Sequence, residues 1–341
     1  MSFNPVVSVI MPVFNNVLYI EEAVYSILNQ TFSDFELIII DDGSTDGTSE
    51  LLKTFTDFRI KTIYFKENKG VSIATNEGFK LAKGKYIARM DGDDVSVPER
   101  LEKQVNVLNE NSHIFICGGL VKYFGGSNEV IPYKEKYSEI LAELLLSCSI
   151  CMGASMFRRK ELANYFYDET RISGEDYYFW TQVAWLGEIY NLQTVLLLYR
   201  VHDRQASTKH KSQQVLDDIS IRLQLFKKLN YDTNKFSDSL VSKMLLLNQP
   251  IKVYELKLFL KWLKTLVLLN SKSKIFSDKE FGSVLNRIRR NLIFKLYFKK
   301  TNVGIDKKWR LQAFSKLPIK EMFFVIQLKI REKKKTFFKN E

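Results

Sequence analysis

The chain has 341 residues, 45% of them hydrophobic, with 25 Phe and 16 Tyr; this composition excludes a disordered protein and supplies one large core and a second small one. Three cysteines without a paired framework argue against a disulfide-stapled secreted fold, and we interpret the Cys148-x-x-Cys151 pair as packing. The formal net charge is +12, of which residues 291–341 carry +10, from 14 Lys and Arg against 4 Asp and Glu.

Short β-branched runs alternate with amphipathic segments in the first quarter of the chain. This alternation is typical of βαβ units and predicts a parallel sheet flanked by helices. In chain order we predict a strand at 6–14, a helix at 19–30, a strand at 35–44, a helix at 45–55, a strand at 60–65, a helix at 70–84 closed by Gly84, and a strand at 85–91.

The segments that follow differ in kind. A helix is predicted at 98–111, with Pro98 near its first turn. Two strands at 114–124 and 129–134, joined by a turn at "GGSN", follow, and then short helices and strands up to about residue 207. Beyond Lys209 the pattern is helical only, so we place a domain boundary near residue 210. The N-terminus lacks the basic start and long apolar run of a signal peptide, and no apolar stretch is long enough to span a membrane; we expect neither a cleaved signal nor a membrane span.

Acidic residues gather where two predicted strands end. "DGDD" places Asp91, Asp93 and Asp94 after one strand, and Asp41 and Asp42 end another. Polar groups at the carboxyl ends of parallel strands point to a ligand crevice along that edge. Asp91 and Asp93 offer two hard oxygen ligands for one divalent cation, although "DGDD" is also an ordinary capped turn. In the same way, Ser44 or Asp46 would serve as the N-cap of the helix at 45–55.

Two further stretches can carry chemistry. In "SGEDYYFW", Glu175 and Asp176 open a helix rich in aromatic residues, where partial desolvation would raise the proton affinity of a carboxylate and suit it to act as a general base. Helix capping by acids is the alternative. In "YRVHDRQAS", His202 lies beside Arg200 and Arg204; a lone His is often structural, but these cations would suit a diphosphate leaving group.

Four motifs in succession resemble family 2 glycosyltransferases. They are "VSVIMPVFNNVLYIEEAVYSILNQTFSDFELIIIDDGSTDGT", "NKGVSIATNEGFKLAKGKYIARMDGDDVSVPERL", "SGEDYYFW" and "YRVHDRQAS", and together they cover residues 5 to 208. The resemblance implies an α/β fold of the GT-A type, Rossmann-like with a mostly parallel central sheet, at residues 1–209. Its nucleotide-sugar-binding half would be 1–97 and its acceptor-side half 98–209, with a helical, basic extension at 210–341.

The resemblance also implies an activity and the residues that carry it. The activity is inverting transfer of a sugar from a nucleotide-diphosphate-sugar, with a UDP-sugar preferred, assisted by Mn²⁺ or Mg²⁺, in a cell-surface polysaccharide pathway. The donor residues would be Pro12, Val13, Asn15 and Asp42 at the base and ribose, Asp41 in support, and Asp91 near the ribose or sugar. His202 would lie near the diphosphate or the metal, and Arg200 would also bind the donor. Asp93 would bind the metal, Asp176 would be the general base and Glu175 would orient the acceptor.

The charged tail suggests where the enzyme works. "IKEMFFVIQLKIREKKKTFFKN" combines apolar residues with dense lysine, which is typical of a segment lying on an anionic membrane surface. We therefore expect a lipid-linked or surface-glycan acceptor and a cytoplasmic protein peripheral to the inner face of the cell membrane. Nucleic acid is not expected, because the acidic crevice would repel it. Residues 210–290 either pack on the catalytic domain or mediate self-association; the segment 253–270 would bury Leu256, Phe259, Leu260, Leu263 and Val267.

Two other functions compete with this hypothesis. A nucleotidyltransferase also binds a nucleotide on a parallel sheet with acidic metal ligands, but "PVFNNVLYI" is not the glycine-rich phosphate loop that it would show. A catalytically silent, membrane-bound sugar-nucleotide or glycan-binding subunit is the other alternative, although binding alone would not need a base such as Asp176.

Overall fold

The fold is described here from a computed structural model, which covers residues 4–202, 211–298, 305 and 307–337. The chain divides into two compact units, Met1–Asp218 and Ile219–Glu341. The division falls inside helix α9 (Lys211–Lys227), whereas the boundary predicted near residue 210 lies outside the described residues.

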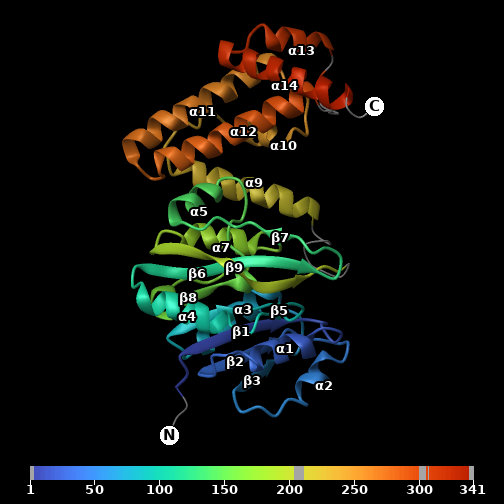
Figure 1. The fold of residues 1–341 in the computed structure, drawn as a ribbon, viewed down its shortest axis with the longest axis vertical. Helices are drawn as coiled ribbons and strands as arrows, with labels where there is room; N and C mark the ends of the chain where they lie inside the picture. Colours follow the sequence, from blue (N-terminus) through green and yellow to red (C-terminus); the bar gives the residue numbers. More distant parts are fainter. Residues whose placement is uncertain (1–3, 203–210, 299–304, 306, 338–341) are drawn as a thin grey trace. The chain divides into compact units, whose positions relative to one another are not determined.

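The first unit is built on one twisted sheet (Figure 1). Its main strands follow the order β3, β2, β1, β4, β8, β6, β9, β5, with β7 paired to β6. The strands are β1 (Val7–Val13), β2 (Phe35–Asp41), β3 (Ile60–Tyr64), β4 (Tyr86–Arg89), β5 (Val95–Ser96), β6 (Ile114–Phe124), β7 (Val130–Ile131), β8 (Met156–Arg158) and β9 (Glu188–Arg200).

The N-terminal half of this sheet is parallel, as the alternation of strands and helices predicts. Strand β1 pairs in parallel with β2 on one side and β4 on the other, and β2 pairs in parallel with β3. Every residue of β1, β2 and β4 is buried, which explains why these strands are nearly uninterrupted apolar runs. Their carboxyl ends therefore meet at one edge of the sheet.

The other half of the sheet is mixed. Strand β8 joins the parallel half to β6 by antiparallel pairing on both sides, while β6 and β9 run parallel over a long register. The predicted turn at "GGSN" joins β6 to the short antiparallel strand β7, with Gly125 at φ 87°. Strand β5 pairs with the end of β9, which brings the segment after "DGDD" next to the segment before His202.

Helices flank the sheet, and those before residue 112 lie within the segments predicted to be helical. They are α1 (Ile20–Leu28), α2 (Thr48–Leu52), α3 (Val71–Leu81), α4 (Arg100–Glu110), α5 (Tyr137–Glu143), the 3₁₀ turn η1 (Met152–Ala154), α6 (Arg159–Leu162) and α7 (Glu175–Val183). One helix end was predicted wrongly: α3 ends at Leu81, and Gly84 lies beyond it. Gly84 instead passes against strand β1, because its N–H donates to Ser8 Oγ at 2.8 Å and a Cβ there would lie 2.5 Å from Ser8 N.

The second unit is helical throughout its described residues, as predicted. After the end of α9 it contains α10 (Asp238–Leu246), α11 (Val253–Ser273), α12 (Asp278–Phe298), α13 (Lys307–Phe314) and α14 (Ile319–Phe337) (Figure 1). The buried face of α11 includes four of the five residues predicted for it, but Val267 is exposed while Trp262 and Leu266 are buried. Within the described ranges, none of the helices combines the length and apolar character needed to cross a bilayer.

Candidate functional site

The loops after β1 and β2 are tied together at the carboxyl edge of the sheet. Asn15 adopts a left-handed conformation, with φ 54°; its N–H donates to Ser44 Oγ at 2.9 Å, and its Oδ1 accepts from Thr45 N at 2.8 Å. Asp42 N donates to Val13 O at 2.8 Å. Pro12 and Val13 themselves lie in β1 and are buried. The predicted donor residues of these two segments are therefore held together at this edge of the sheet.

Asp41 and Asp42 are both buried and both hold backbone in place. Asp41 accepts from Ser44 N at 3.0 Å and from the Ser49 hydroxyl. Asp42 accepts from Lys69 N at 2.7 Å and Gly70 N at 2.9 Å, where α3 begins. Burial raises the pKa of the Asp42 carboxyl, and these two N–H groups oppose the rise. Both acids thus position the loops at the carboxyl edge of the sheet; their direct role toward a donor stays a prediction.

The N-cap expected at Ser44 or Asp46 is wrong. The N-cap of α2 is Gly47, with φ 99°, a conformation that glycine adopts without steric cost. Asp46, one residue earlier, still accepts from Thr48 N at 3.0 Å and also from Val17 N at 3.1 Å. It therefore caps the helix from outside and fastens it to the loop that follows β1.

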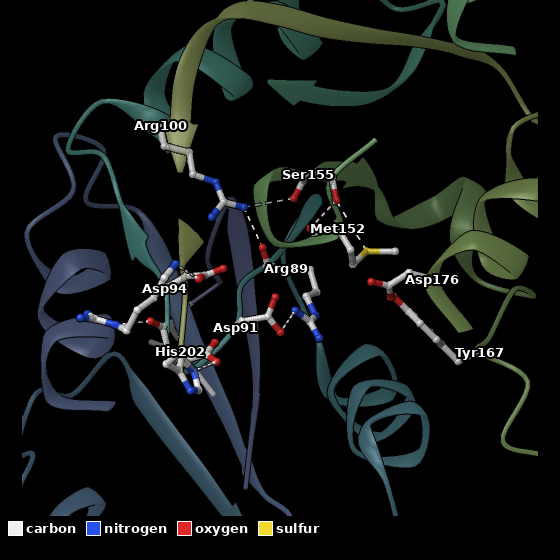
Figure 2. Close-up of polar contacts among 11 residues, drawn as sticks. Arg89, Asp91, Asp94, Arg100, Met152, Ser155, Tyr167, Asp176 and His202 are labelled. Carbon is white, nitrogen blue, oxygen red and sulfur yellow. Dashed lines mark hydrogen bonds and ion pairs between the residues drawn. The ribbon is translucent and has the colours of Figure 1, made fainter. Parts of the chain in front are cut away.

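The three acids of "DGDD" have three different partners (Figure 2). Asp91 forms an ion pair with Arg89. Asp93 Oδ2 lies 3.0 Å from His202 Nε2. Asp94 is buried, and its Oδ1 accepts from the backbone N of Arg200 at 2.9 Å. The cluster is therefore more than a capped turn, because it joins the end of β4 to the end of β9.

Asp93 and His202 fit a divalent cation whose remaining coordination positions are filled by a bound substrate and water. In the part of the chain that the structure describes, no three His, Cys, Asp or Glu side chains form a metal-binding group. Mg²⁺ and similar ions are, however, often held by one or two protein ligands together with substrate phosphates and water. Burial and the charge of Asp91 raise the pKa of Asp93, so a cation here would relieve both effects. The Asp91 carboxylate is paired with Arg89 rather than with the Asp93–His202 pair.

The Arg200 guanidinium is held by protein groups. Its Nε donates to Asp93 O at 2.8 Å, and it pairs with the Glu22 carboxylate. It also lies over the rings of Tyr19 and Phe124, at 4.7 and 4.3 Å from their centroids. This arrangement fixes the backbone of Asp93 and places a positive charge beside the Asp93–His202 pair. Arg204, predicted next to it, lies outside the described residues.

Glu175 and Asp176 begin helix α7 after Gly174, which has φ 67°. Asp176 Oδ1 accepts from the Tyr167 hydroxyl at 2.6 Å. Burial raises the pKa of Asp176, while the Arg89 charge and the Tyr167 hydrogen bond hold it down. Burial and the neighbouring Asp176 raise the pKa of Glu175 to about 7. The pKa of each carboxyl group is therefore raised above its usual value, the direction that suits a general base.

Arg89 and Tyr167 complete this site and were not predicted. Figure 2 shows Arg89 pointing between Asp91 on one side and Asp176 on the other. A signal for Arg89 was present in "YIARMD", since an arginine in a buried strand, two residues before an acid, needs a nearby carboxylate. Tyr167 gives no such signal in the sequence, because its contact with Asp176 depends on how the loop before α7 folds.

The relatives of the chain identify its family. A family model described as glycosyl transferase family 2 matches residues 8–166. An uncharacterized glycosyltransferase of Haemophilus influenzae is 35% identical over 228 residues, which are 62% of this chain and 70% of that protein. The chain belongs to glycosyltransferase family 2. Another relative, the putative glycosyltransferase EpsE of Bacillus subtilis, is 36% identical over 221 residues, 62% of this chain and 78% of EpsE.

Solved structures confirm the GT-A fold expected of this glycosyltransferase. TarS 1-349 of S. aureus, solved with UDP-GlcNAc, aligns with a TM-score of 0.56 at 18% identity, over 88% of this chain and 97% of that one. The mannosyltransferase PcManGT of Pyrobaculum calidifontis, solved with GDP-Man and Mn²⁺, aligns with a TM-score of 0.52 at 15% identity, over 97% of this chain and 87% of that one. The family favours a glycosyltransferase over the nucleotidyltransferase and the silent binding subunit.

Proposed function

We propose that this glycosyltransferase inverts the anomeric carbon as it moves one sugar from a nucleotide-diphosphate-sugar, a UDP-sugar by preference, to a hydroxyl of a lipid-linked or surface-glycan acceptor. One observation carries the proposal: Arg89 faces both the donor-side Asp91 and the acceptor-side Asp176, so groups suited to the two halves of the reaction share one site. The nucleotide-sugars in the TarS and PcManGT structures support the class of donor.

The geometry suits a single displacement. Asp176 would take the proton from the acceptor hydroxyl as the acceptor oxygen forms a bond to the anomeric carbon. The bond from that carbon to the diphosphate oxygen breaks on the opposite face, and the nucleoside diphosphate leaves with the bonding electrons. Glu175, next to the base, would orient the acceptor by hydrogen bonding. One base on the attacking side and charge compensation on the leaving side are sufficient for this reaction.

Asp93 and His202 would hold the metal, Mn²⁺ or Mg²⁺. When bound, the cation would neutralise negative charge that develops on the leaving group. Arg200 would support this site by fixing the Asp93 backbone through the bond from its Nε to Asp93 O. Pro12, Val13 and Asn15, braced by Asp41 and Asp42, would hold the base and ribose.

The test is release of nucleoside diphosphate from a panel of UDP-, GDP- and dTDP-sugars, with membrane extract as acceptor. We expect one donor to give release that depends on Mn²⁺ or Mg²⁺ and stops with EDTA. Release that is equal in EDTA would contradict the metal site. Release from no donor would favour a binding subunit over a catalyst.

We further propose that helix α14 holds the enzyme on the cytoplasmic face of the membrane. Ile319, Phe323, Ile326 and Ile330 are spaced as one helical face, and between 45% and 71% of each side chain is exposed. The opposite face packs inward through Glu321 and Val325. An apolar stripe on the outward face of a docked helix, within a segment of charge +10, suits insertion between anionic lipid headgroups.

Substitution within this stripe should release the protein from vesicles. We expect Phe323→Ser to lower the partition coefficient onto phosphatidylglycerol-containing vesicles about tenfold, because one inserted aromatic ring is lost. Vesicle flotation measures this partition coefficient. A matched control is Phe58→Ser, since Phe58 is 81% exposed but lies in the first unit. Equal flotation of wild type and Phe323→Ser would overturn the membrane proposal without touching the donor assay. Deleting residues 291–341 is less suitable, because it would remove the buried Leu292, Ile293 and Leu296 of α12.

A further inference from the structure

Arg89 is a buried cation at the centre of the site. Only 3% of it is exposed, and its backbone is fixed on both sides: Arg89 N donates to Ser155 O at 3.1 Å, and Arg89 O accepts from Arg100 Nη2 at 2.7 Å. Its guanidinium pairs with Asp91. Its buried Nε has no hydrogen-bond partner in the part of the chain that the structure describes. A buried charge held this firmly must be compensated by nearby charges rather than by water.

The charges that compensate Arg89 come from two elements. The carboxylates of Asp91, on the loop after β4, and Asp176, at the start of α7, both stabilise the Arg89 cation. Asp91 belongs to the "DGDD" segment proposed to bind the donor and the metal, and Asp176 is the proposed base. Arg89 therefore connects the two halves of the reaction electrostatically.

Tyr167 holds Asp176 from the other side. Its hydroxyl donates to Asp176 Oδ1 at 2.6 Å, and its ring stacks on Phe179 with centroids 4.7 Å apart and planes at 11°. Its backbone is clamped by Asn76 of α3, which accepts from Tyr167 N at 2.8 Å and donates to Tyr167 O at 3.0 Å. Burial and the Asp176 charge raise the pKa of Tyr167 well above its usual value, so the phenol remains a donor. The tyrosine is thus a fixed hydrogen-bond donor aimed at one carboxylate oxygen.

We propose that Arg89 and Tyr167 are positioning residues that hold Asp176 in its ionised form and orient it toward the acceptor, with Arg89 linking the base to the donor-side Asp91. This inference rests on the proposed role of Asp176 as the base. A carboxylate removed from water favours its neutral form, which cannot accept the acceptor proton. One cation and one fixed hydroxyl donor oppose that tendency.

The direction of the effect follows from the groups around Asp176. Two of them favour its charged form, Arg89 from β4 and Tyr167 from the loop before α7. The Asp91 carboxylate, after β4, disfavours a negative charge on Asp176. The charge of Asp176 in turn disfavours ionisation of Glu175, on the same helix, and of the free thiols Cys148 and Cys151, between α5 and η1. Removing either favourable group should raise the pKa of Asp176. The acid limb of the turnover profile should then move to higher pH.

Tyr167→Phe is the first test, because it removes only the hydroxyl and keeps the aromatic stack. Turnover is measured from pH 5 to 9.5 with donor, acceptor and Mn²⁺ saturating at each pH, so that the limb reports the loaded enzyme. We expect the acid limb to move up by about one pH unit, with turnover approaching that of wild type at high pH. The control is Tyr190→Phe, which removes another tyrosine–carboxylate bond, 2.9 Å from Tyr190 Oη to Glu135 Oε1, in the same unit. Its limb should not move.

A comparison of Arg89→Lys with Arg89→Gln separates the effect of the positive charge of Arg89 from the effect of its shape. The lysine variant keeps a cation and should keep the limb near its wild-type position, whereas the glutamine variant should move it upward. The proposal would be overturned if the acid limb stayed in place in both Tyr167→Phe and Arg89→Gln while turnover fell equally at every pH. The two residues would then have only a packing role. A fully active Asp176→Asn would instead refute the proposed base, and the two failures are therefore distinguishable.

Discussion

Asp176→Asn should lower turnover about 10²–10⁴-fold while leaving donor affinity nearly unchanged, because general base catalysis contributes a factor of this size. Asparagine keeps a carbonyl oxygen that can accept the Tyr167 hydroxyl, so the hydrogen bond of 2.6 Å has a substitute and the start of α7 is retained. What disappears is the group that takes the acceptor proton. Steady-state turnover and calorimetric titration with the donor measure the two quantities separately.

A neighbouring acid provides the matched control for that substitution. Asp168 lies in the loop before α7, next to Tyr167 in the sequence. Its Oδ1 accepts from the Thr170 hydroxyl, and its Oδ2 lies 3.4 Å from Arg171 Nε. Asp168→Asn should keep turnover within a few-fold of wild type, since the carboxylate is engaged in the loop rather than facing Arg89. Turnover in Asp176→Asn that matches Asp168→Asn would exclude Asp176 as the base and move attention to Glu175, whose pKa is raised to about 7.

The parallel half of the fold could be predicted because local patterns determine it. The strands β1, β2 and β4 are buried on both faces, so their sequences are mostly apolar runs, and acids stand at or just after the ends of β2 and β4. The carboxyl edge follows from their parallel pairing, and with it the position of Asn15, Asp42 and Asp91 just after the ends of neighbouring strands. Helix ends were predicted less well: Gly84 marks a close approach to β1 rather than the end of α3, a distinction made only by tertiary contact.

The partners within the site could not be predicted from local patterns. Which acid of "DGDD" meets which cation depends on β9 lying beside β5, a pairing of segments about a hundred residues apart. That pairing gives Asp93 to His202 and Asp94 to the Arg200 backbone, and leaves Asp91 for Arg89. The same long-range packing brings Tyr167 to Asp176. Composition and spacing thus indicated which residue types carry the chemistry, and the fold assigned their partners.

Asp93→Ala should lower turnover about 10²–10³-fold and should largely remove its dependence on Mn²⁺ concentration, because charge compensation on the leaving diphosphate would be lost. His202→Ala should act in the same direction but less strongly, raising the Mn²⁺ concentration that gives half-maximal turnover. The reason is geometric: Asp93 Oδ2 and His202 Nε2 are 3.0 Å apart and can share one cation, and the carboxylate is the ligand of opposite charge. A Mn²⁺ titration of turnover for both variants measures these effects.

Asp94→Asn is the matched control for the Asp93–His202 pair, since it changes the adjacent acid. Asp94 is buried, and its Oδ1 accepts from Arg200 N; asparagine retains an oxygen for that bond, so the loop that carries Asp93 should hold its shape. We expect its Mn²⁺ titration to overlay that of wild type. If instead Asp94→Asn were as impaired as Asp93→Ala, the three acids would act as one unit and no separate metal ligand could be assigned. If Asp93→Ala kept the wild-type Mn²⁺ dependence, the ligand would have to be sought in Asp91, released from Arg89 when the donor binds.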